Sequence, residues 1–135
     1  MFKAIGIIGT GAMGGTIARL MDGANLLLSN RTKAKAQALA DILKNAQVAG
    51  SAEIAASCDL IFLAVKPQIM PEVLIEIAPL LAARTDRFVL VTMAAGLTIE
   101  TIRDYAGGAY PVIRMMPNTP IAVGAGIITY CISIV

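Results

Sequence analysis

The chain has 135 residues, of which 57% are hydrophobic and 15% are charged, and this length and composition indicate one folded domain rather than a disordered chain. A formal net charge of +2 without a basic run argues against nucleic-acid binding, and no apolar run reaches the roughly 20 residues of a membrane-spanning helix despite the mean hydropathy of +0.75. Two cysteines and no histidine argue against a zinc site or a disulfide framework, so we expect no bound metal, two cysteines that act as small hydrophobic residues, and a cytoplasmic location.

Strand and helix patterns alternate along the chain. In chain order, the sequence predicts a strand at 3–9, a helix at 12–21, a short strand at 26–29, a helix at 33–44, a small strand at 47–49, a helix at 51–57 and an apolar strand at 60–65. A helix with Pro71 in its first turn follows and ends near Leu81. A strand at 88–92, a helix capped by Thr98 and strands at 112–115 and 126–135 complete the pattern. This alternation predicts an α/β fold with a doubly wound, mostly parallel sheet, helices on both faces, and a single domain spanning 1–135.

A glycine-rich loop joins the first predicted strand to the first helix. It matches the pattern G-x-G-x-x-G through Gly9, Thr10, Gly11, Ala12, Met13 and Gly14. In a dinucleotide site of the Rossmann type, the first glycine permits a tight turn, the second lets the backbone approach a pyrophosphate, and the third lets the helix pack against the strand. The N–H groups and the positive dipole end of that helix then face the phosphates. A glycine turn shaped only for packing is the alternative, but the order of strand, motif and helix favours a Rossmann-type cofactor site.

Polar side chains follow the second predicted strand, where a site for NAD usually carries an acidic residue that binds the ribose hydroxyls. Here the segment has no carboxylate and contains instead Asn30, Arg31, Thr32 and Lys33. Arg31 presents a fork of donors suited to a 2′-phosphate, and the other three side chains can add hydrogen bonds. The segment therefore predicts NADPH (NADP+) as the cofactor. The alternative is a polar helix cap, in which Thr32 caps the following helix and the charges are solvated.

Three further segments carry a resemblance to a known family. They read A-V-K-P at 64–67, T-M-A-A-G-L-T at 92–98 and R-M-M-P-N-T-P at 114–120. Together with the glycine loop, they make the chain resemble the N-terminal NADP-binding domain of pyrroline-5-carboxylate reductases over essentially its whole length. The resemblance implies further cofactor contacts from Ala64, Val65, Lys66, Pro67, Ala94, Ala95, Gly96, Asn118 and Thr119. A solvated loop lysine is the alternative for Lys66, and a purely structural turn is the alternative for Asn118 and Thr119.

The resemblance also implies a function. Such reductases use NADPH to reduce 1-pyrroline-5-carboxylate to L-proline, the final step of proline biosynthesis, and form homo-oligomers through a C-terminal helical domain that also shapes the substrate pocket. Residues 1–135 lack that domain, so we expect this chain to bind the cofactor with little or no turnover alone, and we identify no catalytic residue in it. Ser51 stands where some relatives carry an asparagine beside the ribose. Two interpretations stay open beside this one: another NADP-dependent dehydrogenase of the β-hydroxyacid type, and a nucleotide-binding module that does not catalyse.

Overall fold

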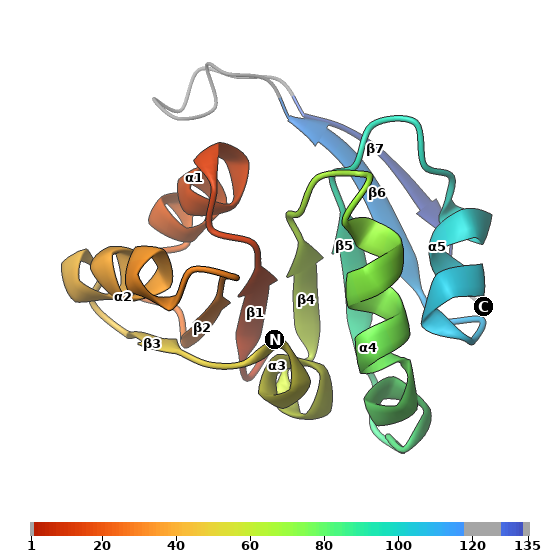
Figure 1. The fold of residues 1–135 in the computed structure, drawn as a ribbon, viewed down its shortest axis with the longest axis horizontal. Helices are drawn as coiled ribbons and strands as arrows, with labels where there is room; N and C mark the ends of the chain where they lie inside the picture. Colours follow the sequence, from red (N-terminus) through yellow and green to blue (C-terminus); the bar gives the residue numbers. More distant parts are fainter. Residues whose placement is uncertain (1, 118–127, 134–135) are drawn as a thin grey trace.

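A seven-stranded sheet forms the centre of the molecule. In the computed structural model, which describes residues 2–117 and 128–133, the strands lie in the order β3-β2-β1-β4-β5-β6-β7 (Figure 1). They are β1 (Ile5–Ile8), β2 (Leu26–Ser29), β3 (Ala46–Val48), β4 (Leu60–Leu63), β5 (Val89–Thr92), β6 (Val112–Pro117) and β7 (Ile128–Ser133). β1 to β6 run parallel, and β7 lies antiparallel beside β6. The predicted doubly wound, mostly parallel sheet is confirmed.

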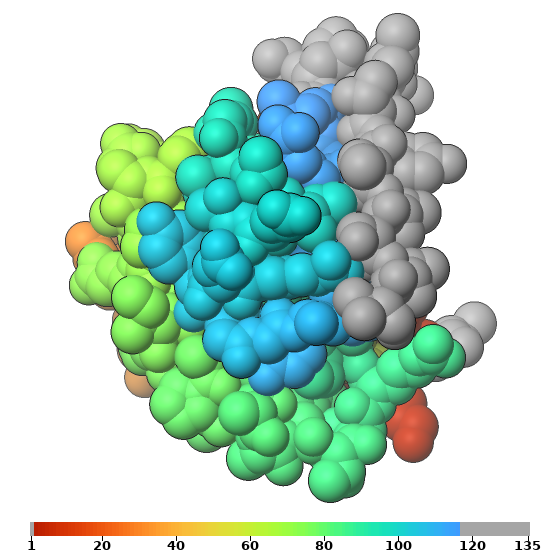
Figure 2. Space-filling view, turned by 90° about the vertical axis from the view of Figure 1, so that its right-hand side faces the viewer, coloured from red at the N-terminus to blue at the C-terminus, as the bar shows by residue number. Residues whose placement is uncertain are grey.

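Helices cover both faces of this sheet. α1 (Ala12–Leu20) and α2 (Lys33–Ile42) pack on one face, where Ile17 and Leu39 share a core with Leu28 of β2. α3 (Ser51–Ser57), α4 (Met70–Ala82) and α5 (Ile99–Ala106) cover the other face, where Ile54 and Leu74 join the second core. Figure 2 shows α5 at the surface next to α4. Because β1 and β4 are fully buried between these layers, their sequences read as continuous apolar runs rather than as alternating ones.

The predicted elements are present, and several are shorter than predicted. β4 ends at Leu63, two residues before the predicted end, and β5 begins at Val89 rather than at 88. α2 ends at Ile42 rather than at 44. The strand predicted at 126–135 appears as β7, within the bounds that the structure describes. The predicted bounds follow the apolar residues, whereas the observed bounds follow the hydrogen bonds between strands. Apolar residues continue past the last hydrogen-bonded pair, so the predicted strands are longer.

Two predicted helix caps have different outcomes. Thr98 caps α5, since its Oγ1 accepts a hydrogen bond from the N–H of Thr101 at 3.1 Å. Thr32 occupies the N-cap position of α2, but its side chain makes no capping hydrogen bond, so that prediction is wrong. The carbonyl of Thr32 instead accepts a hydrogen bond from the Nδ2 of Asn30 at 3.1 Å. The loop before α2 is therefore ordered by Asn30 rather than by the threonine hydroxyl.

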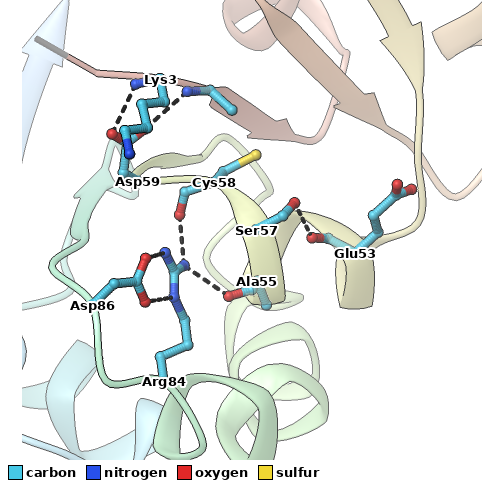
Figure 3. A network of polar contacts seen from close by, with 9 residues as sticks. Lys3, Glu53, Ala55, Ser57, Cys58, Asp59, Arg84 and Asp86 are labelled. Atoms are coloured by element: carbon cyan, nitrogen blue, oxygen red, sulfur yellow. Dashed lines mark hydrogen bonds and ion pairs between the residues drawn. The ribbon is translucent and has the colours of Figure 1, made fainter.

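A buried arginine ties the end of α4 to the end of α3 (Figure 3). The side chain of Arg84 is 4% exposed, and its Nη1 donates to the carbonyls of Ala55 at 2.9 Å and Cys58 at 2.5 Å. Its Nε and Nη2 donate to the two carboxylate oxygens of Asp86 at 2.8 and 2.6 Å, and its guanidinium lies 4.6 Å from the centre of the Phe88 ring. One side chain thus satisfies two carbonyls at the end of α3 and fixes the turn that leads into β4.

The turn between α3 and β4 is also joined to the start of the chain. The carboxylate of Asp59 accepts hydrogen bonds from the backbone N–H groups of Lys3 at 2.8 Å and Ala4 at 3.0 Å (Figure 3). Burial alone would raise the pKa of Asp59, but backbone N–H donors, with Ala4 and Lys3 first among them, and the charge of Arg84 together hold the pKa below its ordinary value. Cys58 is buried as predicted, and burial raises the pKa of its thiol. The side chain of Cys131 lies outside the described part of the chain.

Candidate functional site

The strand order creates a crevice between β1 and β4. Successive strands extend from β1 toward β3 in one direction and from β4 toward β6 in the other. Ile8 at the end of β1 is in register with Leu63 of β4 on one side and with Ser29 of β2 on the other. The loops that leave β1 and β4 therefore diverge to opposite faces of the sheet (Figure 1). Open α/β sheets bind ligands at such a reversal, at the carboxyl ends of the strands.

The glycine loop lies at this crevice, and its three motif glycines differ in what surrounds them. Gly9 has a φ of +101°, and a Cβ there would lie 2.6 Å from the carbonyl oxygen of Ala64. A Cβ at Gly14 would overlap the carbonyl oxygen of Gly9. A Cβ at Gly11 would meet no atom of the described residues within 4 Å. Packing thus requires Gly9 and Gly14, whereas Gly11 faces open space into which a ligand can approach the backbone.

The beginning of α1 offers hydrogen-bond donors to that open space. Gly11 is the N-cap residue, no side chain among the described residues caps the helix, and its first turn contains no acidic residue. The N–H of Gly15 already bonds the carbonyl of Gly11 at 2.8 Å, so the preceding N–H groups stand at the free end of the helix. The Oγ1 of Thr10 in the same loop is buried without a hydrogen-bond partner in the described part of the chain. The loop therefore fits an anionic group such as a pyrophosphate.

The larger of two cavities along the crevice has a volume of about 630 Å³. It lies at the carboxyl ends of β1, β2 and β4 and against the first turns of α4, and is lined by Ile8, Gly9, Gly11, Ser29, Asn30, Arg31, Gly50, Ser51, Ala64, Val65, Lys66, Ile69, Glu72, Val73 and Glu76. We call it the β2 cavity. Its volume lies within the range of small-molecule and cofactor sites, about 300–1,000 Å³. Its wall combines aliphatic side chains with the two cations Arg31 and Lys66 and the two carboxylates Glu72 and Glu76.

A second cavity of about 320 Å³ continues the crevice past the glycine loop toward β5 and β6. We call it the β5 cavity, and it is lined by Gly11, Ala12, Met13, Ala64, Val65, Lys66, Met93 and Met116. It shares Gly11, Ala64, Val65 and Lys66 with the β2 cavity. An extended ligand can therefore cross the loop at Gly11 and reach both cavities.

Nine of the nineteen cofactor residues predicted from the sequence line one or both of these cavities: Gly9, Gly11, Ala12, Met13, Asn30, Arg31, Ala64, Val65 and Lys66. Pro67 follows Lys66 before α4, and Thr10 lines a third cavity between α1 and α2. Thr32 and Lys33 are exposed at the start of α2 and line neither the β2 nor the β5 cavity. After β5, Ala94 is buried and Ala95 and Gly96 are exposed, also without lining either cavity. Asn118 and Thr119 lie outside the described residues.

Charged contacts cross the β2 cavity in a way that the sequence did not indicate. The Nη2 of Arg31, in the loop after β2, lies 3.2 Å from the Oε2 of Glu72 in the first turn of α4. One helical turn further on, the Oγ of Ser51 lies 3.3 Å from the Oε1 of Glu76. Neither glutamate lies at a strand end, where the sequence signals for a cofactor site are found. Their spacing of four residues near the start of α4 nevertheless places both on one helix face.

The residues gathered at the crevice offer groups for each part of a dinucleotide. Among the residues that the structure describes, no group of histidine, cysteine, aspartate and glutamate side chains is arranged to hold a metal ion. Every helix in the described ranges is also too short or too polar to cross a membrane. The crevice offers the end of α1 for phosphate groups, Arg31 and Lys66 for further anionic or hydroxyl groups, and the apolar β5 cavity for a flat ring. This arrangement matches the parts of a dinucleotide.

Comparison with known proteins adds family information. Residues 4–96 match the family model described as NADP oxidoreductase, coenzyme F420-dependent. Pyrroline-5-carboxylate reductase of Corynebacterium melassecola is 37% identical over 124 residues, which are 92% of this chain and 46% of that protein. The chain thus spans about half the length of the curated relatives it matches.

Solved structures resemble the whole fold. Plasmodium falciparum pyrroline carboxylate reductase with NADP bound superposes with a TM-score of 0.75 at 30% identity, covering 96% of this chain and 48% of that one. A pyrroline-5-carboxylate reductase from Coxiella burnetii reaches a TM-score of 0.81 at 27% identity, covering 96% and 49%. The similarity includes β6 and β7, beyond the range of the family model.

Proposed function

Because the chain belongs to the family described as NADP oxidoreductase, coenzyme F420-dependent, and resembles pyrroline-5-carboxylate reductase over 92% of its length, we propose that it is the cofactor-binding part of such a reductase. The proposed reaction is the reduction of the C=N bond of 1-pyrroline-5-carboxylate to L-proline. When bound, NADPH supplies the hydride, and a proton completes the amine as NADP+ is formed. The observation that carries this proposal is the identity that extends along nearly the whole chain, since a glycine loop alone is shared by many dehydrogenases.

The geometry of the crevice supports a specific division of work among its residues. The end of α1 at Gly11 would hold the pyrophosphate, because it combines N–H donors with room for close approach. Arg31 would hold the 2′-phosphate at the far end of the β2 cavity, and Asn30 would order the loop that carries it. Lys66 lines both cavities and would contact the ribose or phosphates between them. The contacts implied for Ala94, Ala95, Gly96, Asn118 and Thr119 belong to the same proposal.

The remainder of the proposed enzyme lies beyond this chain's match to its relatives. The chain covers 46% of the Corynebacterium reductase, and we propose that the other part of the full-length protein supplies most of the substrate pocket and the homo-oligomer contacts. A cytoplasmic location belongs to the same proposal, as the resemblance implies. We assign no catalytic acid or base within residues 1–135. The role left to this chain is to bind and orient the reduced cofactor.

Calorimetric titration of the chain with NADPH and NADH tests the cofactor assignment. NADPH should bind more tightly, and Arg31→Ala should weaken NADPH by about tenfold, which corresponds to about 1.4 kcal/mol, because one charge-assisted contact to the phosphate is lost. NADH affinity should change less than about twofold, because NADH lacks the phosphate. Arg87→Ala is the matched control, since Arg87 is also exposed but precedes β5, at the opposite end of the strands. Equal affinities of the parent chain for the two cofactors would contradict the assignment.

The reaction itself is tested on the longer protein that combines this chain with the second part found in its relatives. That protein should form proline from 1-pyrroline-5-carboxylate with NADPH, and the 135-residue chain should show negligible turnover while still binding NADPH. Turnover of a β-hydroxy acid without proline formation would move the function to the β-hydroxyacid dehydrogenases. Cofactor binding by the longer protein with no turnover of either substrate would identify a nucleotide-binding module.

A further inference from the structure

Two carboxylates face the β2 cavity from one side of α4, opposite the loops that carry its polar groups. Glu72 and Glu76 are one helical turn apart, and both line the cavity. Their partners differ in charge. Glu72 pairs with the guanidinium of Arg31, whereas Glu76 is bonded to the neutral hydroxyl of Ser51. Only Glu72 therefore engages the cation that the proposed function assigns to a cofactor phosphate.

The ion pair between Arg31 and Glu72 is weak enough for Arg31 to exchange the carboxylate for a phosphate. The two side chains are 71% and 68% exposed, and a single contact of 3.2 Å joins them. Exposed ion pairs of this kind contribute little to stability, because water solvates both partners and their side chains lose entropy on pairing. A phosphate monoester carries a charge near −2 and three acceptor oxygens, so it is a stronger partner for a guanidinium than one carboxylate oxygen. Arg31 can therefore leave Glu72 for a phosphate without disturbing the fold.

We propose that Glu72 is a specificity-determining residue, which holds Arg31 across the β2 cavity and releases it when a 2′-phosphate enters. The proposal rests on the function proposed above and goes beyond it by assigning a role to a residue outside the strand ends. Binding of a 2′-phosphorylated dinucleotide breaks the pair and leaves the carboxylate without its cation. An unphosphorylated dinucleotide leaves the pair intact. Glu72 thus lowers the affinity for NADP+ and not for NAD+, and so reduces the ratio of NADP+ to NAD+ affinity that Arg31 provides.

The test is a double-mutant cycle on the 135-residue chain, read by calorimetric titration with NADP+ and with NAD+. Glu72→Gln keeps the length and polarity of the side chain and removes the charge. It should strengthen NADP+ binding by about two- to fivefold, the range expected from one exposed ion pair, and change NAD+ binding by less than about twofold. The gain should shrink as ionic strength rises, because salt screens exposed charges. Equal changes for the two cofactors would overturn the proposal.

Two comparisons establish that the effect runs through Arg31. In the Arg31→Ala background, Glu72→Gln should alter NADP+ affinity by less than about twofold, since the pair is already absent. An undiminished gain in that background would mean that Glu72 repels the phosphate directly, and the proposal would be wrong. Glu76→Gln is the matched control on the same helix face, and it should leave the ratio of NADP+ to NAD+ affinity unchanged. A shift in that ratio equal to the shift from Glu72→Gln would also overturn the proposal.

Failure of this inference can be told apart from failure of the proposed function. If Arg31→Ala weakens NADP+ selectively while Glu72→Gln leaves the NADP+ to NAD+ ratio unchanged, Arg31 binds the phosphate but Glu72 does not restrain it. If the parent chain binds neither dinucleotide, or if Arg31→Ala leaves NADP+ affinity unchanged, the cofactor site itself is misassigned. Both results reject the proposal for Glu72. Only the absence of dinucleotide binding, or an unchanged NADP+ affinity in Arg31→Ala, also rejects the proposed cofactor site.

Discussion

Gly11→Val separates the cofactor role of the glycine loop from its structural role. Gly11 has φ −71° and ψ −158°, an extended conformation that any residue adopts, and a Cβ there meets nothing within 4 Å in the described part of the chain. Valine is a poorer N-cap residue than glycine, which costs up to about 1 kcal/mol, and it restricts the unfolded chain, which offsets a similar amount. We therefore expect the free energy of unfolding to change by about 1 kcal/mol or less.

The effect on binding should be much larger. The valine side chain would occupy the open space in front of the first N–H groups of α1, where the proposed pyrophosphate lies. A hydrogen bond to a charged group contributes roughly 1.5–3 kcal/mol. Loss of two such bonds removes about 3 kcal/mol or more, which corresponds to at least about a hundredfold weaker binding of NADPH. Gly11→Ala adds a single methyl group and should give an intermediate loss.

The assay combines urea unfolding with calorimetric titration on the same preparations. Gly14→Ala is the contrasting variant, because its added Cβ overlaps the carbonyl oxygen of Gly9 and should destabilise the fold itself. Gly11→Val should keep the unfolding curve of the parent chain and lose NADPH binding, whereas Gly14→Ala should shift the unfolding curve to lower urea concentration. A folded Gly11→Val protein that binds NADPH with parental affinity would show that the phosphates lie elsewhere.

Two predictions concern the network in Figure 3. Arg84→Met should lower the free energy of unfolding by about 3 kcal/mol in urea titrations, because it leaves the carbonyls of Ala55 and Cys58 without their donor. Asp86→Asn, at an exposed position, should lower it far less. Similar losses for the two variants would refute this assignment. The pKa of Asp59 is lowered in the folded state, so its carboxylate should contribute stability that is present above about pH 4 and lost as the pH falls through the folded pKa. The Asp59→Asn variant should therefore be less stable than the parent at pH 7 and lose less stability on acidification. Parallel pH profiles of unfolding for the two proteins would contradict this prediction.

The fold was predictable because its signals are local. Continuous apolar runs marked β1 and β4, and glycine and proline marked the turns around them. The direction of β7 was also within reach of the sequence, although it was not predicted. Residues 118–127 link β6 to β7, and a parallel crossover needs a dozen or more residues, so the link length favours the antiparallel arrangement that the structure shows.

The candidate site could be predicted from the sequence only where a single segment carries the whole signal. Within six residues the glycine loop makes a tight turn, leaves room for a ligand near the backbone, and lets α1 pack against β1. In the structure these roles correspond to Gly9, Gly11 and Gly14, respectively. Thr32 shows the limit of such reasoning, since a good N-cap residue at the right position still makes no capping bond when Asn30 orders the loop from the other side. Met93, which follows β5, and Met116 of β6 both line the β5 cavity, and no pattern in the sequence joins them.

If the two proposals for Arg31 and Glu72 hold, the cofactor preference of this chain depends on two walls of the β2 cavity. The loop after β2 supplies Arg31, and its lack of a carboxylate points to a phosphorylated ribose. The structure places a carboxylate at the same point after all, but it comes from Glu72 on α4, 41 residues away in the chain. Under the proposal for Glu72, in which the phosphate displaces the carboxylate, the affinity that Arg31 provides is the difference between its contact with the phosphate and its contact with Glu72. Under that proposal, the residues after β2 predict which cofactor binds more tightly, and Glu72 on α4 would set how large the difference in affinity is.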